Sequence, residues 1–313
     1  MSSGAAYIDC EARYIKETWF MKKPIPVILD TDIGSDIDDS WALVMLLNSP
    51  ELDLKLITTA TFNTDHRTAI TAKLLQAANR TDIPIGTGIK TLDHPIQVSP
   101  WIKGFNMKKY KGKVYADGVD AMIKTIMKSK EKITLISIGP VTNIAEALRR
   151  EPRIAKKCRF IGMHGSIAKK YGGEPGISAE YNVVVDVISA KAVFDAPWAS
   201  MTITPIDTCE VIKLDGELYR RVKECKNPLT KALIDSYQVW LGGKSDEGRS
   251  SVLFDTVAVY LAFAEDMLEI EEKPVDISFD GYTKVKEKGK KIRWALEWKD
   301  LEKFREFLVG RLI

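Results

Sequence analysis

The sequence is poor in cysteine and histidine, and it has no long apolar segment. Its 313 residues include four widely spaced cysteines, Cys10, Cys158, Cys209 and Cys225, with no CxxC pair, so a thiolate zinc site is not expected. Such cysteines are typical of reduced thiols in a cytoplasmic protein. No apolar run reaches the length of a signal-peptide core or a membrane-spanning helix. We therefore expect a soluble, cytoplasmic protein without a membrane partner.

The charge of the chain is nearly balanced, with a formal net charge of +3. Local lysine runs occur only at 108–113 and 284–291, and no aromatic side chains are interleaved with those lysines in the pattern of a nucleic-acid surface. Nucleic acid is therefore not an expected partner. The hydrophobic content of 45% is ordinary for a folded protein with an ample core.

Apolar runs of strand length alternate with helical segments from Pro24 onward. Strands are expected at 24–30, 52–61, 83–89, 133–139, 158–165 and 200–207. Helices are expected at 38–47, 65–79, 117–129, 140–150 and 188–194. This alternation predicts an α/β fold with an open, mostly parallel sheet flanked by helices.

The remaining segments complete this prediction. The last third is expected to form helices at 214–224, 228–240 and 253–263, a small C-terminal β-hairpin within 276–298 and a final helix from Asp300. Residues 90–116 are expected to be a long basic loop, and residues 1–23 an N-terminal extension of unknown role. Because no low-complexity linker interrupts residues 24–313, we expect them to form a single domain.

Five aspartates follow the first predicted strand. The segment DTDIGSDIDD contains Asp30, Asp32, Asp36, Asp38 and Asp39. In an open α/β sheet, ligands bind beyond the carboxyl ends of the strands, which is where this segment lies. Helix capping accounts for one or two of these acids but not for five. Because like charges so close repel each other, we expect a bound cation among them.

Two known types of acidic site can be compared with this segment. An EF-hand loop needs a bidentate Glu at its twelfth position, and counting from Asp30 that position is Trp41, so this interpretation fails. A magnesium-dependent phosphatase of the haloacid dehalogenase type would use a DxD sequence after the first strand, with the first Asp as nucleophile. The phosphatase stays open as an alternative, although it gives the Asp38–Asp39 pair no role.

The segment DTDIGSDIDDSWAL resembles the signature of the inosine/uridine-preferring nucleoside hydrolases, in which D-x-D-x-G is followed by D-D-x-x-A-L. The form with two extra residues before the D-D pair is similar to a bacterial branch of that family. Further blocks resemble the family in the same order: LITTATFN, ISIGPVTNIAEAL, YGGEPGISAEYNVVVD and LFDTVAV. The resemblance spans residues 24 to about 260. It implies a Rossmann-like nucleoside hydrolase fold, a role in purine or pyrimidine salvage, and a homodimer or homotetramer.

The resemblance also implies a set of site residues. A calcium ion would be held by Asp32, Asp39, Asp255 and the main-chain carbonyl of Ile138, and Asp32 would deprotonate a metal-bound water. The ribonucleoside would be bound by Asp38, Asn63, Met163, Glu180, Tyr181 and Asn182, with Asn182 also counted as catalytic. Of these, Met163 would pack under the sugar and Tyr181 would stack on the base. Each residue also has a simpler structural reading, such as a helix cap at Asp255 or Asn182, or surface at Glu180.

The implied reaction suits this composition. Breaking an N-glycosidic bond builds positive charge on the ribose, which carboxylates and amide oxygens stabilise more in the transition state than in the substrate. Direct attack by water would invert the anomeric carbon. Polar groups that bind the ribose hydroxyls would discriminate against deoxyribose.

The sequence departs from the family pattern around the base. Phe254 stands where family members have a His that protonates or cradles the leaving base, and Glu174 stands where they have an Asn. His164, Tyr237 and Trp240 are candidates for the base pocket, or else core residues. The base preference therefore stays open. So does a second alternative, a binding protein that retains the ribonucleoside contacts and has lost turnover together with the His.

Overall fold

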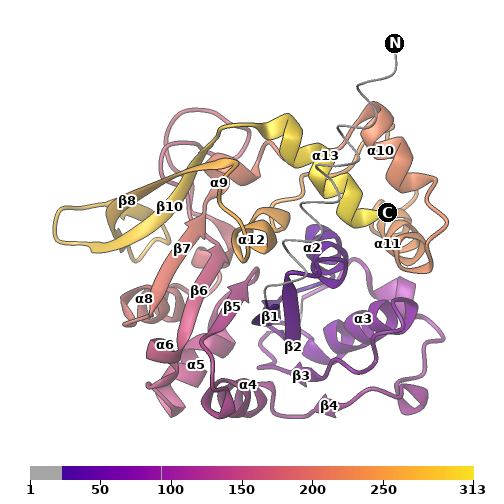
Figure 1. The fold of residues 1–313 in the computed structure, drawn as a ribbon, viewed down its shortest axis with the longest axis horizontal. Coiled ribbons are helices and arrows are strands. Elements are labelled where there is room, and N and C mark those ends of the chain that lie inside the picture. The colour runs from indigo at the N-terminus through magenta and orange to yellow at the C-terminus, as the bar shows by residue number, and fades with distance from the viewer. Residues whose placement is uncertain (1–22, 93) are drawn as a thin grey trace.

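The computed structural model describes residues 23–92 and 94–313 (Figure 1). Residues 1–22 of the predicted extension lie outside this part. The strands are β1 (Ile25–Thr31), β2 (Leu52–Thr59), β3 (Ile85–Thr87), β4 (Val114–Tyr115), β5 (Ile133–Ser137), β6 (Cys158–Met163), β7 (Ser200–Thr204), β8 (Leu268–Ile277), β9 (Thr283–Val285) and β10 (Lys290–Trp298).

Helices follow most of the strands. Those of six or more residues are α2 (Asp38–Leu47), α3 (Thr64–Ala77), α4 (Gly118–Lys128), α5 (Thr142–Arg150), α8 (Val187–Asp195), α10 (Gly216–Lys223), α11 (Pro228–Trp240), α12 (Thr256–Leu261) and α13 (Leu301–Leu312). The single-turn helices are η1 (Ser99–Ile102), η2 (Met107–Lys109), α6 (Ile154–Lys157), α7 (Tyr181–Val184) and α9 (Ile206–Cys209).

The described strands form one ten-stranded sheet in the order β4-β3-β2-β1-β5-β6-β7-β10-β8-β9. All neighbours from β4 to β10 are parallel, and β8 pairs antiparallel with β10 and with β9. The chain builds the sheet outward from β1 to β4 and then returns to add β5 on the other side of β1. This reversal makes the carboxyl ends of β1 and β5 a topological switch point, where open α/β sheets bind ligands.

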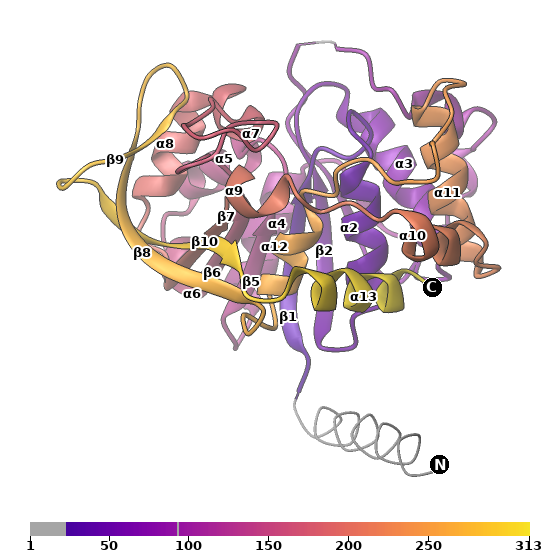
Figure 2. The ribbon, with the colours of Figure 1, turned by 90° about the horizontal axis from the view of Figure 1, so that it is seen from above.

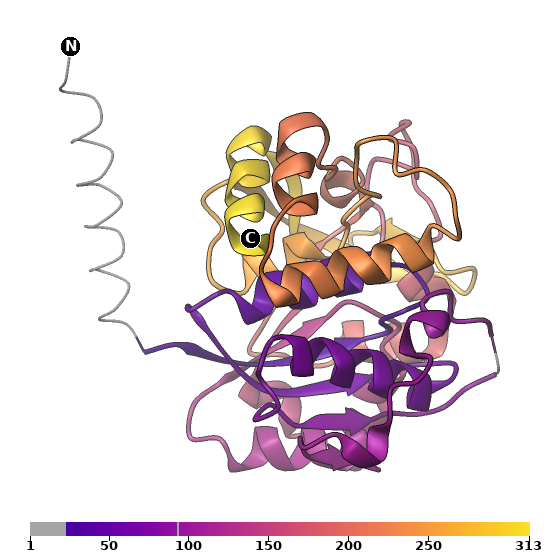
Figure 3. The same cartoon turned by 90° about the vertical axis from the view of Figure 1, so that its right-hand side faces the viewer.

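Helices cover both faces of the sheet, because successive side chains of a buried strand point to opposite faces. Val27 and Leu29 of β1 belong to a core shared with α2, α3, α11, α12 and α13, whereas Ile28 belongs to a second core shared with α4, α5 and α8. Figure 3 shows the C-terminal helices, in orange and yellow, stacked above the N-terminal strands. The mostly parallel α/β architecture predicted from the sequence is confirmed.

Local capping explains where several helices begin. The Asp117 carboxylate accepts the Asp120 N–H at 2.8 Å at the start of α4, and the Asp300 carboxylate accepts the Lys303 N–H at 2.9 Å at the start of α13. Helix α11 has Asn227 as its N-cap and Pro228 in its first turn. Each cap satisfies an amide that the helix itself leaves unpaired.

The structure corrects three predicted segments. Residues 90–116, predicted as loop, contain η1, η2 and the short edge strand β4. The helix expected from residue 140 begins at Thr142. The C-terminal hairpin is part of a larger antiparallel ribbon, because β8 begins at Leu268, and it joins the main sheet through β10 (Figure 2). The glutamates of β8 give the segment a polar composition, and on its outer side β8 pairs with β9 only at Val275–Ile277.

None of the described helices is both long enough and apolar enough to cross a bilayer.

Helix α13 offers a matched pair of stability predictions. Leu308 is fully buried, and Leu308→Ala should lower the free energy of unfolding by about 2–5 kcal/mol through the cavity it leaves. Gly310 lies two residues along the same helix, and a Cβ there would meet no neighbouring atom. Gly310→Ala should therefore raise the free energy of unfolding by about 0.5–1 kcal/mol. Urea unfolding curves measure both, and equal midpoints for the two variants would contradict this packing of α13.

Candidate active site

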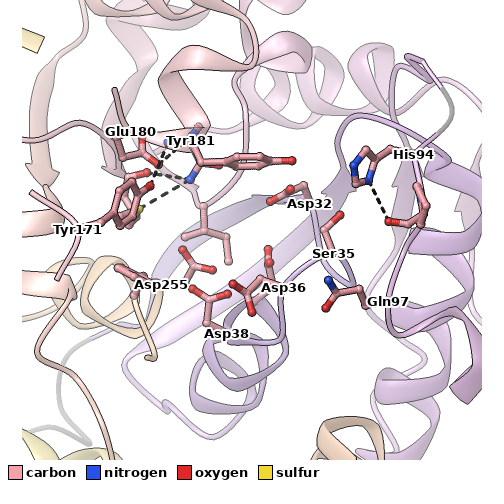
Figure 4. A pocket seen from close by; sticks show the side chains of 16 residues that line it. Asp32, Ser35, Asp36, Asp38, His94, Gln97, Tyr171, Glu180, Tyr181 and Asp255 are labelled. Carbon is pink, nitrogen blue, oxygen red and sulfur yellow. Dashed lines mark hydrogen bonds between the residues drawn. The ribbon is translucent and has the colours of Figure 1, made fainter. Parts of the chain in front are cut away.

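A cavity of about 340 Å³ opens at the carboxyl ends of β1, β5 and β6 (Figure 4). Its size falls within the range of small-molecule sites, about 300–1,000 Å³. The turn after β1 contributes Asp32, Ser35, Asp36, Asp38 and Asp39, and the ends of β5 and β6 contribute Ile138 and Met163. The loop after β3 contributes His94, Pro95 and Gln97, and the remaining wall consists of Tyr171, Glu180, Tyr181, Asn182, Phe254 and Asp255.

Three buried carboxylates converge on one side of this cavity. Asp38 and Asp39 in the first turn of α2, together with Asp255 before α12, are 3–5% exposed, and their carboxylate oxygens lie within 4.8 Å of one another. Burial first, and then repulsion among the aspartates, raises the pKa of each carboxyl well above its usual range. An all-oxygen donor set of this kind fits a hard divalent cation such as Ca²⁺ or Mg²⁺.

Asp32 lies next to this trio and is tied to a buried arginine. The Arg67 guanidinium on α3 is fully buried, and its Nη2 lies 3.6 Å from Asp32 Oδ2. Burial raises the pKa of Asp32, and the Arg67 charge opposes that rise. The cluster within 4.8 Å contains Asp38, whereas the resemblance implied Asp32 as the third side-chain ligand. The position of Asp32 between Arg67 and the trio is consistent with a group that exchanges a proton.

Arg67 also holds the backbone around the aspartates. Its Nε donates to Thr61 O, its Nη1 to Ile33 O and its Nη2 to Ser35 Oγ, each at 2.9 Å. Thr61 and Phe62 both have positive φ angles, of 60° and 52°, in a region that side-chain-bearing residues seldom adopt. The arginine thus clamps the acidic turn against the strained segment after β2.

A second buried network, made of hydrogen bonds, links the ends of β1 and β2 to the start of α5. Asp30 Oδ1 accepts hydrogen bonds from the Thr58 hydroxyl and, at 2.9 Å, from Asn143 Nδ2. Asn143 also donates to Thr59 O at 3.0 Å and accepts the Ile89 N–H at 2.9 Å. Burial raises the pKa of Asp30 to about 7. Asn143 is therefore a crosslink between β1, β2 and the loop after β3, as well as a residue at the start of α5.

The opposite wall is built around the start of α7. Both Glu180 carboxylate oxygens accept backbone N–H groups, from Asn182 at 2.7 Å, Gly165 at 3.0 Å and Val183 at 3.2 Å. Burial raises the pKa of Glu180 to about 7. The side-chain amide of Asn182 donates to the main-chain oxygen of Met163 at 3.1 Å. Asn182 and Met163 both line the cavity. Glu180 is thus a buried cap that orients Asn182, and the surface reading of Glu180 is wrong.

Most of the predicted site residues line this one cavity: Asp32, Asp38, Asp39, Ile138, Met163, Glu180, Tyr181, Asn182 and Asp255. Asn63 is the exception, because it is not among the lining residues and its side chain caps α3 by accepting the His66 N–H at 3.2 Å. The simple capping role suggested for Asp255 is not observed, since its side chain makes no cap hydrogen bond.

The three candidates for the base pocket lie elsewhere. His164 is fully buried between Phe160 and Phe194, with Nε2 3.3 Å from Gly139 O, and burial lowers its pKa to about 4. Tyr237 and Trp240 stack on each other, with ring centroids 5.8 Å apart. They line a neighbouring cavity that shares Gln97 with the first.

Sequence reasoning missed four lining residues that loops bring to the cavity: His94, Pro95, Gln97 and Tyr171. The first three lie in the segment read as a basic loop. The sequence could have indicated these three residues, because their loop follows a parallel strand. Such loops emerge at the same edge of the sheet as the aspartates. Tyr171 lies in the Gly-rich loop, where its hydroxyl accepts the Tyr181 N–H at 3.1 Å.

The model of the inosine-uridine preferring nucleoside hydrolases matches residues 27–306. A pyrimidine-specific ribonucleoside hydrolase, RihA, from Escherichia coli O1:K1 / APEC is 30% identical over 234 residues, covering 71% of this chain and 73% of that protein.

Two solved structures share the fold. A plant nucleoside hydrolase, the PpNRh1 enzyme, superposes with a TM-score of 0.79 at 22% identity, covering 93% of this chain and 99% of the other. An inosine-uridine preferring nucleoside hydrolase from Bacillus anthracis superposes with a TM-score of 0.74 at 16% identity, covering 92% and 99%. The family match over most of the chain, together with the acidic cavity at the switch point, makes this chain an enzyme of the inosine-uridine preferring nucleoside hydrolase family.

Proposed function

We propose that this enzyme hydrolyses the N-glycosidic bond of ribonucleosides to ribose and free base, with Ca²⁺ as its cofactor. The observation that carries the proposal is the convergence of the buried side chains of Asp32, Asp38, Asp39 and Asp255 on one cavity, which Asn182 and Glu180 also line. Carboxylates and amides in such numbers suit a reaction that builds positive charge on a sugar. Family membership favours this reaction over the magnesium-dependent phosphatase.

The sugar occupies the side of the cavity where buried polar groups are held in place. Asp38 and Asn182 bind ribose hydroxyls, Glu180 fixes the Asn182 backbone, and Met163 packs under the ring. The hydrogen bonds of Glu180 and Asn182 to Gly165 N–H and Met163 O support this assignment, because they leave these side chains little freedom to reorient. Asn63 acts at a distance as the cap of α3, the helix that carries Arg67.

Asp32, Asp39, Asp255 and the Ile138 carbonyl would hold the cation, and Asp38 lies within the same carboxylate cluster. When bound, the cation supplies positive charge that lowers the pKa of a water molecule and offsets the repulsion among the carboxylates. Asp32 accepts the proton of the attacking water, a role favoured by its raised pKa, while the Arg67 charge favours the ionised form that can accept a proton. Water attacks C1′ from the carboxylate side, and the configuration at the anomeric carbon inverts.

The wider assignments belong to the same proposal. Residues 24–313 act as one catalytic domain, which the continuous ten-stranded sheet of the described residues supports. The enzyme works in the cytoplasm, consistent with free thiols at Cys158, Cys209 and Cys225. The fourth cysteine, Cys10, lies outside the described residues. The enzyme works as a homodimer or homotetramer.

A ribose-release assay tests the reaction class directly. Purified enzyme with Ca²⁺ should release reducing sugar from inosine, uridine or cytidine, and much less from the matching 2′-deoxyribonucleosides, because a site built to bind a hydroxyl discriminates by about 10⁴-fold against its loss. A phosphate monoester serves as the parallel substrate. Phosphate release with intact nucleosides would replace the proposal by the phosphatase, and saturable nucleoside binding without ribose release would replace it by a binding protein.

Asp32→Asn tests the general base. The variant keeps the size and hydrogen-bonding shape of the side chain but removes the proton acceptor, so kcat should fall by about 10²–10⁴-fold or more. Circular dichroism and a thermal melt establish that the fold persists. Asp65→Asn, at an exposed position in the first turn of α3, is the matched control and should keep full activity. Near-normal turnover in Asp32→Asn would remove Asp32 from the mechanism.

Calcium should stabilise the fold more at pH 8 than at pH 5. Because burial raises the pKa of Asp38, Asp39 and Asp255, the folded state without the cation holds protons that the unfolded chain releases. Its stability therefore falls as pH rises from the ordinary carboxyl range through the raised pKa values. A bound cation removes this loss, so the difference in melting temperature between calcium and chelator should widen with pH.

Asp255→Asn should narrow that difference, whereas Asp235→Asn, an exposed partner of Lys231 on α11, should leave it unchanged. A calcium effect of equal size in the wild type and Asp255→Asn would contradict a cation at this cluster.

A further inference from the structure

The proposed reaction leaves the departing base in need of a proton that Phe254 cannot give. Phe254 is half-buried, and Tyr171 packs against it edge-on with ring centroids 6.2 Å apart. A base that leaves as an anion is a poor leaving group, and a positioned proton donor contributes typically 10²–10⁴-fold to such a step. The inference below rests on the proposed function and concerns the source of this proton.

Most acidic groups in the cavity are already engaged. Both Glu180 oxygens accept backbone N–H groups and cap α7. Asp32, Asp38, Asp39 and Asp255 are grouped on the cation and sugar side. Tyr171 accepts a backbone N–H, and burial raises the pKa of Tyr181 to about 12, which makes it a weak acid.

His94 is the one imidazole among the described residues that line the cavity. Figure 4 shows it across the cavity from Asp255 and Tyr171, on the wall that the carboxylate trio leaves free. Its Nδ1 lies 3.1 Å from Pro95 O. In the tautomer that donates Nδ1–H to this carbonyl, Nε2 is the nitrogen left to exchange a proton.

The ring of His94 packs against the ring of Phe62. It stacks on Phe62 with centroids 4.7 Å apart and planes at 21°, and the Arg67 guanidinium lies 5.5 Å from the centroid of the same Phe62 ring. Arg67 therefore contacts both the acidic turn, through Ile33 O and Ser35, and the residue on which His94 rests. The buried Arg67 side chain therefore connects the acidic turn with the stacked rings of Phe62 and His94.

The loop that carries His94 is anchored at both ends. Phe62 N–H donates to Thr91 Oγ1 at 2.7 Å, and Thr91 N–H donates back to Phe62 O at 3.2 Å. At the other end, Val98 N–H donates to Gly34 O at 3.0 Å in the acidic turn. These contacts hold Thr91 and Val98, on either side of His94, at fixed positions relative to Phe62 and the acidic turn.

We propose that His94 is the proton donor to the leaving base. The C1′–N bond breaks with its electron pair passing to the base nitrogen, which takes the proton from Nε2 of the imidazolium form of His94. The attacking water forms the new C1′–O bond and gives its proton to Asp32. His94 is left neutral with Nδ1–H on Pro95 O, and solvent returns both groups to their starting states.

Substrates that differ only in the need for a proton separate this role from a structural one. In His94→Ala and in His94→Gln, kcat for inosine or uridine should fall by about 10²-fold or more. The same variants should hydrolyse 4-nitrophenyl β-D-ribofuranoside nearly as fast as the wild type, because 4-nitrophenolate departs without protonation. His66→Ala, which removes an exposed imidazole whose Nδ1 lies 3.2 Å from Ser99 Oγ, is the control and should keep both activities.

Each contrary outcome has a distinct meaning. If the wild type cleaves neither nucleosides nor the nitrophenyl riboside, the proposed function fails and the His94 role fails with it. If the wild type is active and His94→Ala loses both activities equally, or neither, only the His94 role is overturned. A selective loss with nucleosides in Asp36→Asn, and not in His94→Ala, would overturn it in favour of the Asp36 carboxylate at the same opening.

Discussion

Repulsion among the buried carboxylates after β1 is the interaction on which the rest of this site depends. Asp32, Asp38, Asp39 and Asp255 are each no more than 5% exposed, so water screens their charges poorly. Three features of the chain oppose this repulsion. The first turn of α2 presents its N-terminal dipole to Asp38 and Asp39, Arg67 lies beside Asp32, and the all-oxygen trio suits a divalent cation. A site this acidic is unfavourable without a compensating positive charge, which a divalent cation would supply.

Close backbone approach is the second requirement, and two glycines meet it. A Cβ on Gly139 would lie 2.7 Å from Asp32 N, and one on Gly88 would lie 2.0 Å from Thr59 O. Because these two glycines have no side chain, the backbone that follows β5 and the backbone that follows β3 can pack directly on the ends of β1 and β2. Asn143 bonds Asp30, Thr59 and Ile89 across the same junction. The cation side of the cavity is therefore built from strand ends that are crosslinked to one another.

This construction explains which parts of the site could be predicted from the sequence. Asp32, Asp39, Ile138 and Met163 follow strands whose apolar runs are easy to recognise, and parallel strands bring their carboxyl ends together. The cap of Glu180 on α7 and the crosslinks of Asn143 depend on tertiary contacts, so neither could be predicted from the residue type alone. Asn63 matched a motif, yet its side chain is used to cap α3. His94 and Tyr171 reach the cavity from loops, and the loop of His94 depends on positive φ angles at Thr61 and Phe62, which neither residue type favours.

The lining residues are thus held in two ways, some by strand ends that are crosslinked to one another and others by loops. Around the end of β1, Asp30, Asp32 and Asp39 are held by Asn143, Arg67 and Thr31, so a substitution there disturbs several partners at once. Four other lining residues, His94, Gln97, Tyr171 and Phe254, come instead from loops and from the segment just before α12. A loop residue such as His94 can therefore be replaced without removing any contact of the acidic cluster, whereas its own position depends on how the loop is held. The paired hydrogen bonds of Phe62 with Thr91, and of Val98 with Gly34, hold that loop.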